Sequence, residues 1–568
     1  MVGLSRTASG EPVPLAADRA VAPIARATRR DKVIGWLAPL GVTLLALGLR
    51  LVHLGSPHRF AFDETYYAKD AWSLLNNGYV ETYRDSDHVN DKILEGHVHG
   101  QWTGDPSLAV HPDVGKWLIA LGEKAFGMDP FGWRIASAVV GSLMVLVLCR
   151  LVRRLTGSTL LGCVAGVLLM LDGLHFVLSR LALLDIFLAF FLLCAVSCLV
   201  ADRDWLRARL ARGLGAGAPS YPGNGWGPRI LLRPWLLAAG VSFGLALGTK
   251  WTAAYPLAAF GVLCWVWSAG ARRSFGVRRP LLKGVVADGI PAFVHLVVVA
   301  AIVYLATWGG WLTHAHAYEE HLSSTQYRQY TGHGHCDDDD YVADDLDTTK
   351  RWPTATEKDA HGVGEAWQSL RSLWYYHQDV WTFHTKFLNC STHFYASKPS
   401  SWLLVNRPVG VAVTNDISRD APGCDAPAGS HCIKQVLLIP TPVLWWGGLL
   451  ALMFSVVMWV GTRDWRYGVA VVGALSTWLP WMLYDDRPIF LFYAIATLPF
   501  TVIATTLAIG HLLGPSRLPS PRRTAGVVVG GAFVILTLVN FAWFYPILTN
   551  RMITHGEWLD RIWFSRWI

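Results

Sequence analysis

Charged residues are scarce in this sequence. Asp, Glu, Lys and Arg make up only 16% of the 568 residues, whereas 52% are hydrophobic. Globular domains carry about 25% charged residues. The deficit, together with 28 tryptophans, excludes an ordinary large soluble domain and indicates a polytopic membrane protein.

Cysteine is sparse and shows no metal or redox pattern. None of the nine cysteines stands in a CxxC motif, which argues against a zinc ribbon or a thioredoxin-like site. Several lie in apolar runs and are interpreted as small hydrophobic side chains. In "CDAPAGSHC", Cys424 and Cys432 either form a short disulfide, if the segment faces an oxidising compartment, or remain free.

The sequence also lacks a cleavable signal. Its first apolar run is long and has no small-residue cleavage motif, so we expect it to stay as an anchor. Residues 1–32 are rich in Ala, Pro and Arg and are predicted to form a disordered cytosolic tail. The net charge of +8 is spread over short segments between apolar runs, which favours membrane orientation over nucleic-acid binding.

Long apolar runs dominate what remains. Runs of roughly 17–25 apolar residues can cross a bilayer, and we identify eleven: 34–54, 131–150, 159–176, 181–200, 232–249, 252–268, 285–311, 437–460, 468–484, 488–511 and 526–545. Alternate connections are basic, for example "RLVRR" and "RRSFGVRR". The positive-inside rule therefore predicts an all-α multi-pass protein of the cell membrane with a cytoplasmic N-terminus and an external C-terminus.

This topology leaves two large external segments, 55–130 and 312–436. It divides the chain into an N-terminal transmembrane module (33–311), which contains the first of them, the large external loop (312–436), and a C-terminal four-helix module with an external tail (437–568). Residues 110–127 are apolar but too short and too charged to span. We expect them to form an interfacial amphipathic helix.

Ionisable residues gather at the outer ends of the predicted helices. They are Asp63, Glu64, Arg134, Asp172, His175, Arg180, Asp185, Lys250, Asp485, Asp486 and Arg487. Charges at a membrane edge are costly and indicate function by default. Cations at external helix ends also oppose the positive-inside trend, so an anionic ligand such as a lipid phosphate is expected there.

Structural explanations exist for each residue taken alone. Asp63 could cap the helix that follows it. Arg134 and Lys250 could extend to lipid headgroups, and Asp185 could pair with Arg180. The "HGHCDDDD" stretch could bind a divalent cation, although a solvated acidic loop is favoured because consecutive aspartates cannot all converge on one ion. The joint pattern instead suits a transferase that uses a lipid-phosphate donor, which needs a general base and cations on one face.

Eight motifs then occur in a characteristic order: "FAFDETYYAKDA", "HPDVGKWL", "WRIASAVVG", "RLALLDIFLAFF", "GLALGTKWTAAYP", "HFYASKPSSWLLVNRPV", "TWLPWMLYDDRPIFLFYAIATLPF" and "EWLDRIWFSRWI". By these motifs the chain resembles the protein O-mannosyltransferases, glycosyltransferase family 39 with the GT-C fold, over roughly residues 34–568. It is similar to the bacterial form, because no separate β-trefoil MIR domain fits in the second external segment.

The resemblance implies a function. Mannose would be transferred from polyprenyl-phosphate mannose to Ser or Thr hydroxyls of secreted or membrane proteins, including proteins in Sec translocation, at the outer membrane face. The family inverts the anomeric centre in a single displacement. The lipid-linked donor and membrane lipids are then the expected small-molecule partners. No other cofactor is implied, and dependence on a divalent metal is left open.

The resemblance also assigns roles to residues. Asp63 becomes the general base, with Glu64 as a supporting residue, because neighbours in a helix do not face the same way. The donor phosphate and lipid are assigned to Arg134, Arg180, Asp185, Lys250 and Arg487, with Arg134 also ordering the catalytic loop. The acceptor side and external loop are assigned to His111, Lys116, His393, Trp402 and Arg407. No metal ligands are assigned.

Two departures from the family pattern stand out. The usual His-Pro-Pro is His111-Pro112-Asp113 here, which puts the geometry of this loop in doubt because proline rigidifies such turns. The family's Gly-Asn-Pro is replaced by "IPTPVLWW" at 439–446, so no role of its Asn can be carried over.

Three other functions compete with this prediction. Another GT-C enzyme could glycosylate a glycolipid or a cell-wall glycan with the same external Asp, although the "HFYASKPSSW" motif favours a protein acceptor. A transporter would place charges at the midplane, often within inverted repeats, and no repeat is visible. A scaffold for secretion machinery would leave Asp63 dispensable.

Overall fold

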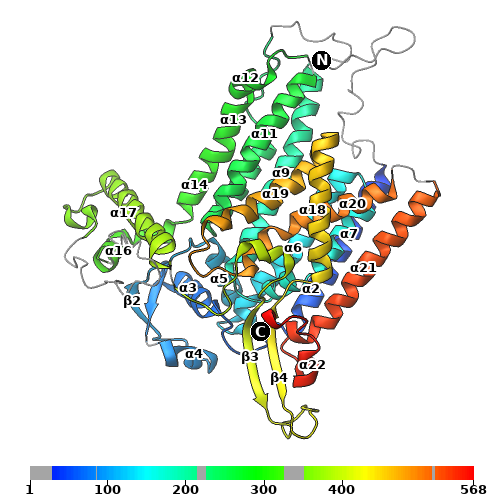
Figure 1. The fold of residues 1–568 in the computed structure, drawn as a ribbon. Coiled ribbons are helices and arrows are strands. Elements are labelled where there is room, and N and C mark those ends of the chain that lie inside the picture. Colours follow the sequence, from blue (N-terminus) through cyan, green and yellow to red (C-terminus); the bar gives the residue numbers. More distant parts are fainter. Residues whose placement is uncertain are drawn as a thin grey trace, which may run out of the picture.

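The computed structural model describes residues 28–84, 86–213, 225–274, 276–324, 351–389, 391–514 and 518–568. Figure 1 shows a helical bundle with smaller elements at its lower end and at one side. Most of the predicted tail and the "HGHCDDDD" stretch lie outside the described residues. The predominantly helical, multi-pass fold predicted from the sequence is confirmed.

Each of the eleven predicted spans contains a helix of the bundle. These helices are α2 (Arg29–Leu51), α6 (Pro130–Thr156), α7 (Thr159–Met170), α9 (Leu184–Gly213), α10 (Pro234–Leu247), α11 (Ala254–Ser274), α12 to α14 (Pro280–Ala306), α18 (Pro442–Thr462), α19 (Trp465–Trp478), α20 (Leu498–Leu513) and α21 (Pro521–Leu548). Within the described residues, seven helices have the length and apolar composition to cross a membrane, and α7, α10 and α20 are shorter apolar helices. The number of crossings stays a prediction.

Polar contacts interrupt the predicted span 159–176. The helix α7 ends at Met170, and α8 (Gly173–Leu178) restarts after Asp172. The buried Asp172 carboxylate accepts from the backbone nitrogens of His175 (2.8 Å) and Thr441 (3.1 Å). It also accepts from the Trp445 indole at 2.7 Å. These bonds give Asp172 a structural role, joining α8 to the start of α18.

The first segment predicted to be external, 55–130, folds into short elements. They are α3 (Glu64–Asn77), β1 (Glu81–Tyr83), α4 (Ser86–Leu94), β2 (Trp102–Pro106) and α5 (Val114–Phe126). The strands β1 and β2 pair antiparallel. The helix α5 confirms the helical part of the prediction for residues 110–127. Its placement at the membrane interface stays a prediction.

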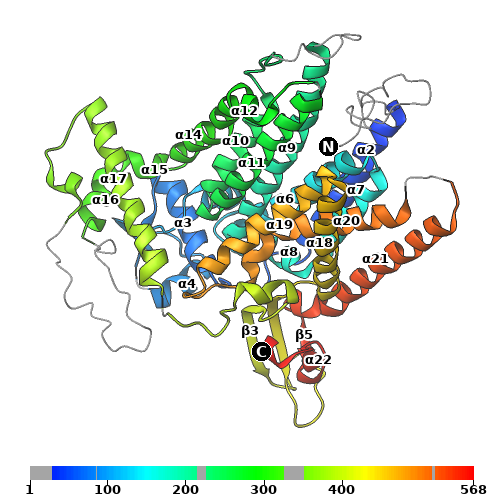
Figure 2. The ribbon, with the colours of Figure 1, turned by 45° about the horizontal axis from the view of Figure 1, so that its top comes forward.

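The second segment predicted to be external, 312–436, contains α16 (Ala315–Leu322) and α17 (Val363–Thr382), and α15 (Gly309–Thr313) begins just before it. A second apolar core, separate from that of the bundle, fixes α17 on α15. Its members include Trp308, Trp311, Trp352 and Tyr376, all at most 2% exposed. Figures 1 and 2 both show α16 and α17 together at the side of the bundle, beside the end of α14.

A three-stranded antiparallel sheet follows, which sequence periodicity did not predict. It has the order β3 (Val409–Ile417), β4 (Cys432–Leu438) and β5 (Met552–Thr554), and α22 (His555–Leu559) comes after it. Its register pairs Val409 with Leu438 and Ile433 with Ile553. The predicted span 437–460 therefore starts with the end of a strand, and its helix begins only at Pro442.

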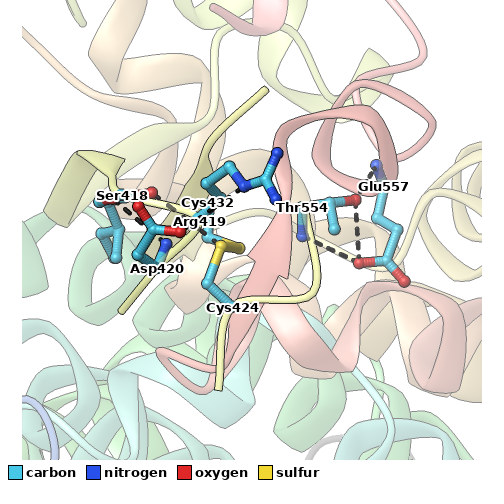
Figure 3. Close-up of a disulfide and its surroundings, with 8 residues drawn as sticks. Ser418, Arg419, Asp420, Cys424, Cys432, Thr554 and Glu557 are labelled. Carbon is cyan, nitrogen blue, oxygen red and sulfur yellow. Dashed lines mark hydrogen bonds and ion pairs between the residues drawn. A yellow bond between two sulfur atoms is a disulfide. The ribbon is translucent and has the colours of Figure 1, made fainter. Parts of the chain in front are cut away.

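The structure decides between the two alternatives left open for Cys424 and Cys432: they form a disulfide, with their Cα atoms 5.8 Å apart. Figure 3 shows the bond between the β3–β4 loop and the first residue of β4, with Thr554 and Glu557 on the neighbouring strand and helix. The disulfide closes the loop of the hairpin, and β5 and α22 support its other side.

Candidate active site

The stretch between α2 and α3 is held by one arginine. Arg134, near the start of α6, is fully buried. Its guanidinium donates to the backbone carbonyls of Leu54 (3.3 Å), Pro57 (2.9 Å) and Arg59 (2.9 Å). Its remaining donors bind the Glu64 carboxylate at 2.8 and 2.7 Å. All three guanidinium nitrogens are therefore committed to protein acceptors, which favours the loop-ordering role of Arg134 over contact with a phosphate.

Glu64 is equally committed. Its carboxylate is fully buried and accepts from the backbone nitrogens of Ala61 (2.9 Å) and Ala182 (3.0 Å) in addition to Arg134. It thus ties the start of α3 to α6 and to the turn before α9. This geometry suits the supporting role and leaves little carboxylate capacity for a substrate.

Asp63 immediately precedes Glu64 but has a different hydrogen-bonding environment. It occupies the N-cap position of α3, but its side chain makes no capping hydrogen bond. The side chain interacts with the Tyr67 hydroxyl, and burial raises the pKa of Asp63 to about 6. The nearby Lys250 opposes this rise and Asp185 adds to it. A half-buried carboxyl with a pKa near neutrality is suited to accept a proton.

Asp185 and Lys250 form a buried pair across two helices. The Lys250 ammonium, between α10 and α11, donates to both carboxylate oxygens of Asp185 at 2.9 and 2.8 Å. The suggestion that Asp185 pairs with Arg180 is therefore wrong. Arg180 instead donates to the carbonyls of Arg50, Val52 and His53 at the end of α2. A cation there offsets the negative end of the helix dipole.

A pocket opens beside these residues. Its cavity volume is about 250 Å³, and the pocket is partly open to its surroundings. The lining residues are Val110, His111, Lys250, Trp251, Thr252, Ala254, Tyr255, Trp381, His384, Thr385, Trp481, Tyr484, Arg487 and Tyr493. Asp63 does not line this pocket, but it interacts with Lys250, which does, and with Tyr67, whose ring centroid lies 6.3 Å from that of His111.

Arg487 enters the pocket with its charge uncompensated. Its Nη1 donates to the Nδ1 of His384 at 2.8 Å and to the His384 carbonyl at 3.1 Å. Its Nε is buried without a partner. In the part of the chain that the structure describes, no carboxylate forms an ion pair with Arg487. A guanidinium in this state can bind an anion.

His384 is a functional candidate that sequence reasoning missed. It stacks on His111 with ring centroids 5.5 Å apart. Burial and the adjacent Arg487 lower the pKa of His384 to about 4, and burial lowers the pKa of His111 well below its usual value. Both rings are therefore neutral at pH 7. The "FHTKF" segment carries no spacing signal that would have identified His384.

The remaining acceptor-side candidates have mainly structural contacts. Lys116 is 1% exposed and pairs with Asp70 (3.2 Å) and Asp113 (3.3 Å). Asp113, which stands where the family pattern has proline, thus supplies a carboxylate partner for Lys116 that proline could not supply. Trp402 is fully buried and donates to Ser397.

The last two acceptor-side candidates, His393 and Arg407, have different surroundings from each other. His393 packs edge-on against Phe62, the residue before Asp63, with ring centroids 6.3 Å apart. Arg407 donates to the Phe394 carbonyl at 2.8 Å and to the carbonyl of Ile568. The structure therefore places His111 beside Tyr67 and His393 beside Phe62, while Lys116, Trp402 and Arg407 stabilise the surrounding loops.

Metal ligands do not gather among the described residues: no group of three His, Cys, Asp or Glu side chains has a metal-binding arrangement there. Asp485 and Asp486, beside Arg487, are exposed, in agreement with a solvated turn.

Comparison with known proteins gives consistent matches. The family model "Dolichyl-phosphate-mannose-protein mannosyltransferase" matches residues 41–212. The model "C-terminal four TMM region of protein-O-mannosyltransferase" matches residues 369–567. The yeast Pmt1–Pmt2 protein O-mannosyltransferase complex, solved with its sugar donor bound, shares the fold with a TM-score of 0.65 at 13% identity, covering 97% of this chain and 94% of that one.

Relatives with higher sequence identity align with this chain over most of the length of both proteins. A polyprenol-phosphate-mannose–protein mannosyltransferase of Mycobacterium tuberculosis is 35% identical, covering 99% of this chain and 98% of its own. The protein of the same name from Corynebacterium glutamicum is 30% identical, covering 89% of this chain and 88% of its own. Since family models match both halves in order and the relatives align over most of their length, this chain belongs to the dolichyl-phosphate-mannose-protein mannosyltransferase family.

Proposed function

We propose that this protein transfers mannose from polyprenyl-phosphate mannose to Ser or Thr hydroxyls of secreted or membrane proteins at the outer face of the membrane. One observation carries the proposal. Among the described residues in and around the pocket, Asp63 and Arg487 have no charged hydrogen-bonding partner, whereas Glu64 is paired with Arg134 and Asp185 with Lys250. An anion-binding cation thus lines the cavity, and a base interacts with Lys250 of the same lining.

The two charges fit a single displacement at the anomeric carbon. Asp63 accepts the proton of the acceptor hydroxyl as its oxygen forms the new bond to C1 of mannose. The bond from C1 to the phosphate oxygen breaks, and the electron pair leaves with polyprenyl phosphate. Arg487 stabilises the charge that develops on this phosphate, as electrostatic catalysis requires. One displacement inverts the configuration at C1.

The positive charge of Lys250 is largely neutralised by Asp185, whereas that of Arg487 is not. It lines the pocket, but Asp185 holds it with two hydrogen bonds. We assign Lys250 to positioning near the phosphate and to limiting the pKa of Asp63, and Asp185 to orienting Lys250. Arg134 and Arg180 are assigned to the loop around Asp63, since their donors are bound to backbone carbonyls and Glu64.

The external location follows from the proposed orientation. Asp63 follows the end of α2, and Arg59 of the same stretch donates to Thr414 of β3 at 2.6 Å. The disulfide-bonded hairpin and the site therefore share one end of the bundle, and Figure 1 shows α2 starting at the other end. A disulfide suits an oxidising compartment, which supports an external site and a cytoplasmic start of α2.

Reconstitution tests the proposal. Vesicles containing the protein and polyprenyl-phosphate mannose are mixed with a Ser/Thr-rich peptide and, in a parallel arm, with a glycolipid acceptor. The expected product is mannosyl-peptide with inverted anomeric configuration, determined by NMR. Preferential mannosylation of the glycolipid would instead establish the glycan-acceptor function. Retention of configuration would exclude the single displacement.

A further inference from the structure

The helix α17 exposes a stripe of tryptophans. Trp367, Trp374 and Trp381 are 64%, 63% and 54% exposed. They stand seven residues apart, so at 3.6 residues per turn all three project from nearly the same side. Val363 and Leu370, at 90% and 37% exposure, fall on the same side. We call these five residues the tryptophan stripe.

The stripe remains after α17 has buried its other apolar face. Leu373, Tyr376 and Val380 are at most 2% exposed and pack into the second apolar core. The Tyr376 hydroxyl also donates to the Ala109 carbonyl at 2.7 Å. Since α17 is fixed by these contacts, its position does not depend on the stripe. A second apolar face that stays exposed indicates an interaction surface.

A hydrogen bond places α17 at the end of a membrane-spanning segment. His377 binds the hydroxyl of Tyr304 at 2.5 Å, and Tyr304 lies two residues before the end of the candidate span Pro280–Ala306. Beside Tyr304 on this span, Ile302 and Leu305 are 61% and 42% exposed. The apolar surface of the span thus reaches the level of His377, and Figures 1 and 2 show α17 beside that end of α14.

We propose that the tryptophan stripe inserts into the interfacial region of the bilayer and anchors α17 to the membrane leaflet beside the site. Tryptophan combines a large apolar ring with one polar N–H, and it is enriched where hydrocarbon meets headgroups. The stripe bears no charge and offers no carbonyl or carboxylate side chain, which favours lipid over a polar Ser/Thr-rich polypeptide. An amphipathic helix at this level would lie on the membrane rather than cross it.

The anchor would place the pocket mouth at lipid level. Trp381 lines the candidate active site, and with Trp374 it also lines a neighbouring hollow that contains Trp251 and His377. The membrane surface under the stripe therefore continues to the pocket entrance. This consequence rests on the proposed function, because it concerns the path of a lipid-linked donor. The membrane contact itself does not.

Site-specific photocrosslinking tests the contact. The photoreactive residue p-benzoylphenylalanine is placed at Trp367 or Trp374 in the full chain, in native membranes. Glu365 is the matched control, because it is exposed on the opposite side of the same helix. Phospholipid adducts are expected at 367 and 374 and not at 365. Adducts with polypeptides at 367 and 374, or equal lipid labelling at all three positions, would overturn the proposal.

An activity measurement separates this proposal from the proposed function. The Trp367→Ser variant should transfer mannose several-fold more slowly from a long-chain donor in vesicles, but normally from a short-chain donor in detergent. Trp226→Ser, which changes an exposed tryptophan outside this region, should alter neither rate. Equal loss with both donors would contradict the anchor. Absence of transfer by the wild type would reject the proposed function and leave the crosslinking result to decide the anchor.

Discussion

The carboxylate of Glu64 and the guanidinium of Arg134 form two hydrogen bonds, at 2.8 and 2.7 Å, with neither side chain exposed to solvent. The preceding residue, Asp63, shares none of this contact and faces Lys250 and Tyr67 instead. Two adjacent carboxylates therefore have separate tasks. Glu64 fixes the backbone from which Asp63 extends toward Lys250 and Tyr67.

Asp63→Asn should abolish mannose transfer while the protein stays folded. The amide keeps the size of the side chain and cannot accept the hydroxyl proton. Loss of a positioned base typically lowers rates by about 10²–10⁴-fold. Mannosyl-peptide formation and the thermal midpoint are measured on the same preparation. Wild-type turnover by this variant would remove Asp63 from the role of base.

Arg134→Met should destabilise the protein. It leaves the Glu64 carboxylate buried and unpaired, and breaking such a pair costs about 3–5 kcal/mol. Thermal unfolding in detergent checks this result. Lys398→Gln is the matched control, because Lys398 pairs with Asp485 at 3.9 Å while 78% exposed, and exposed pairs contribute about 0–1 kcal/mol.

A stable Arg134→Met protein with weakened donor binding would contradict this structural role. It would show that the guanidinium serves the lipid phosphate, despite its bonds to Leu54, Pro57 and Arg59.

The activity should rise with pH around the pKa of Asp63. Burial raises that pKa to about 6, so the carboxylate is protonated and inactive as a base below this value. The ratio kcat/KM should fall about tenfold per pH unit well below pH 6 and level off above pH 7. The pKa values of His111 and His384 are lowered, that of His384 to about 4, so neither ring should titrate in this window.

The pH profile is measured between pH 5 and pH 8 with the donor below its KM. Asp63→Glu should shift the midpoint if any activity remains. An unchanged midpoint in this variant would assign the titration to another group.

Sequence reasoning located the membrane helices because an apolar run is a local property of the chain. It failed where distant residues decide the structure. The break at Asp172 depends on Thr441 and Trp445, and the β3–β4–β5 sheet joins residues near 435 to residues near 553. Neither interaction leaves a periodic pattern in a single sequence.

The candidate site shows the same limit. The ordered motifs proposed Asp63, Glu64 and Arg487 as site residues, but they could not show which charged groups are paired. The partner of Asp185 is Lys250, 65 residues away, rather than the nearby Arg180. The partner of Arg487 is His384, 103 residues before it. Trp367, Trp374 and Trp381 stand at helical spacing, but this periodicity alone does not show which side of the helix is exposed.

His384 should control the strength of Arg487 as an anion site. A neutral imidazole orients the guanidinium through Nδ1 without cancelling its charge. His384→Glu would add a carboxylate next to Arg487 and neutralise it, whereas His384→Asn retains a neutral hydrogen-bond acceptor. We therefore expect the KM for polyprenyl-phosphate mannose to rise strongly in His384→Glu, about as much as in Arg487→Ala, and modestly in His384→Asn.

Steady-state kinetics with varied donor and then varied peptide distinguishes this role from general damage. The KM for peptide should change little in all three variants, because Arg487 acts on the phosphate. Equal increases in both KM values, or a larger effect of His384→Asn than of His384→Glu, would show that His384 supports the fold of the pocket. Such a result would also argue against binding of the donor phosphate by Arg487, because the neutrality of His384 would then be irrelevant to donor binding.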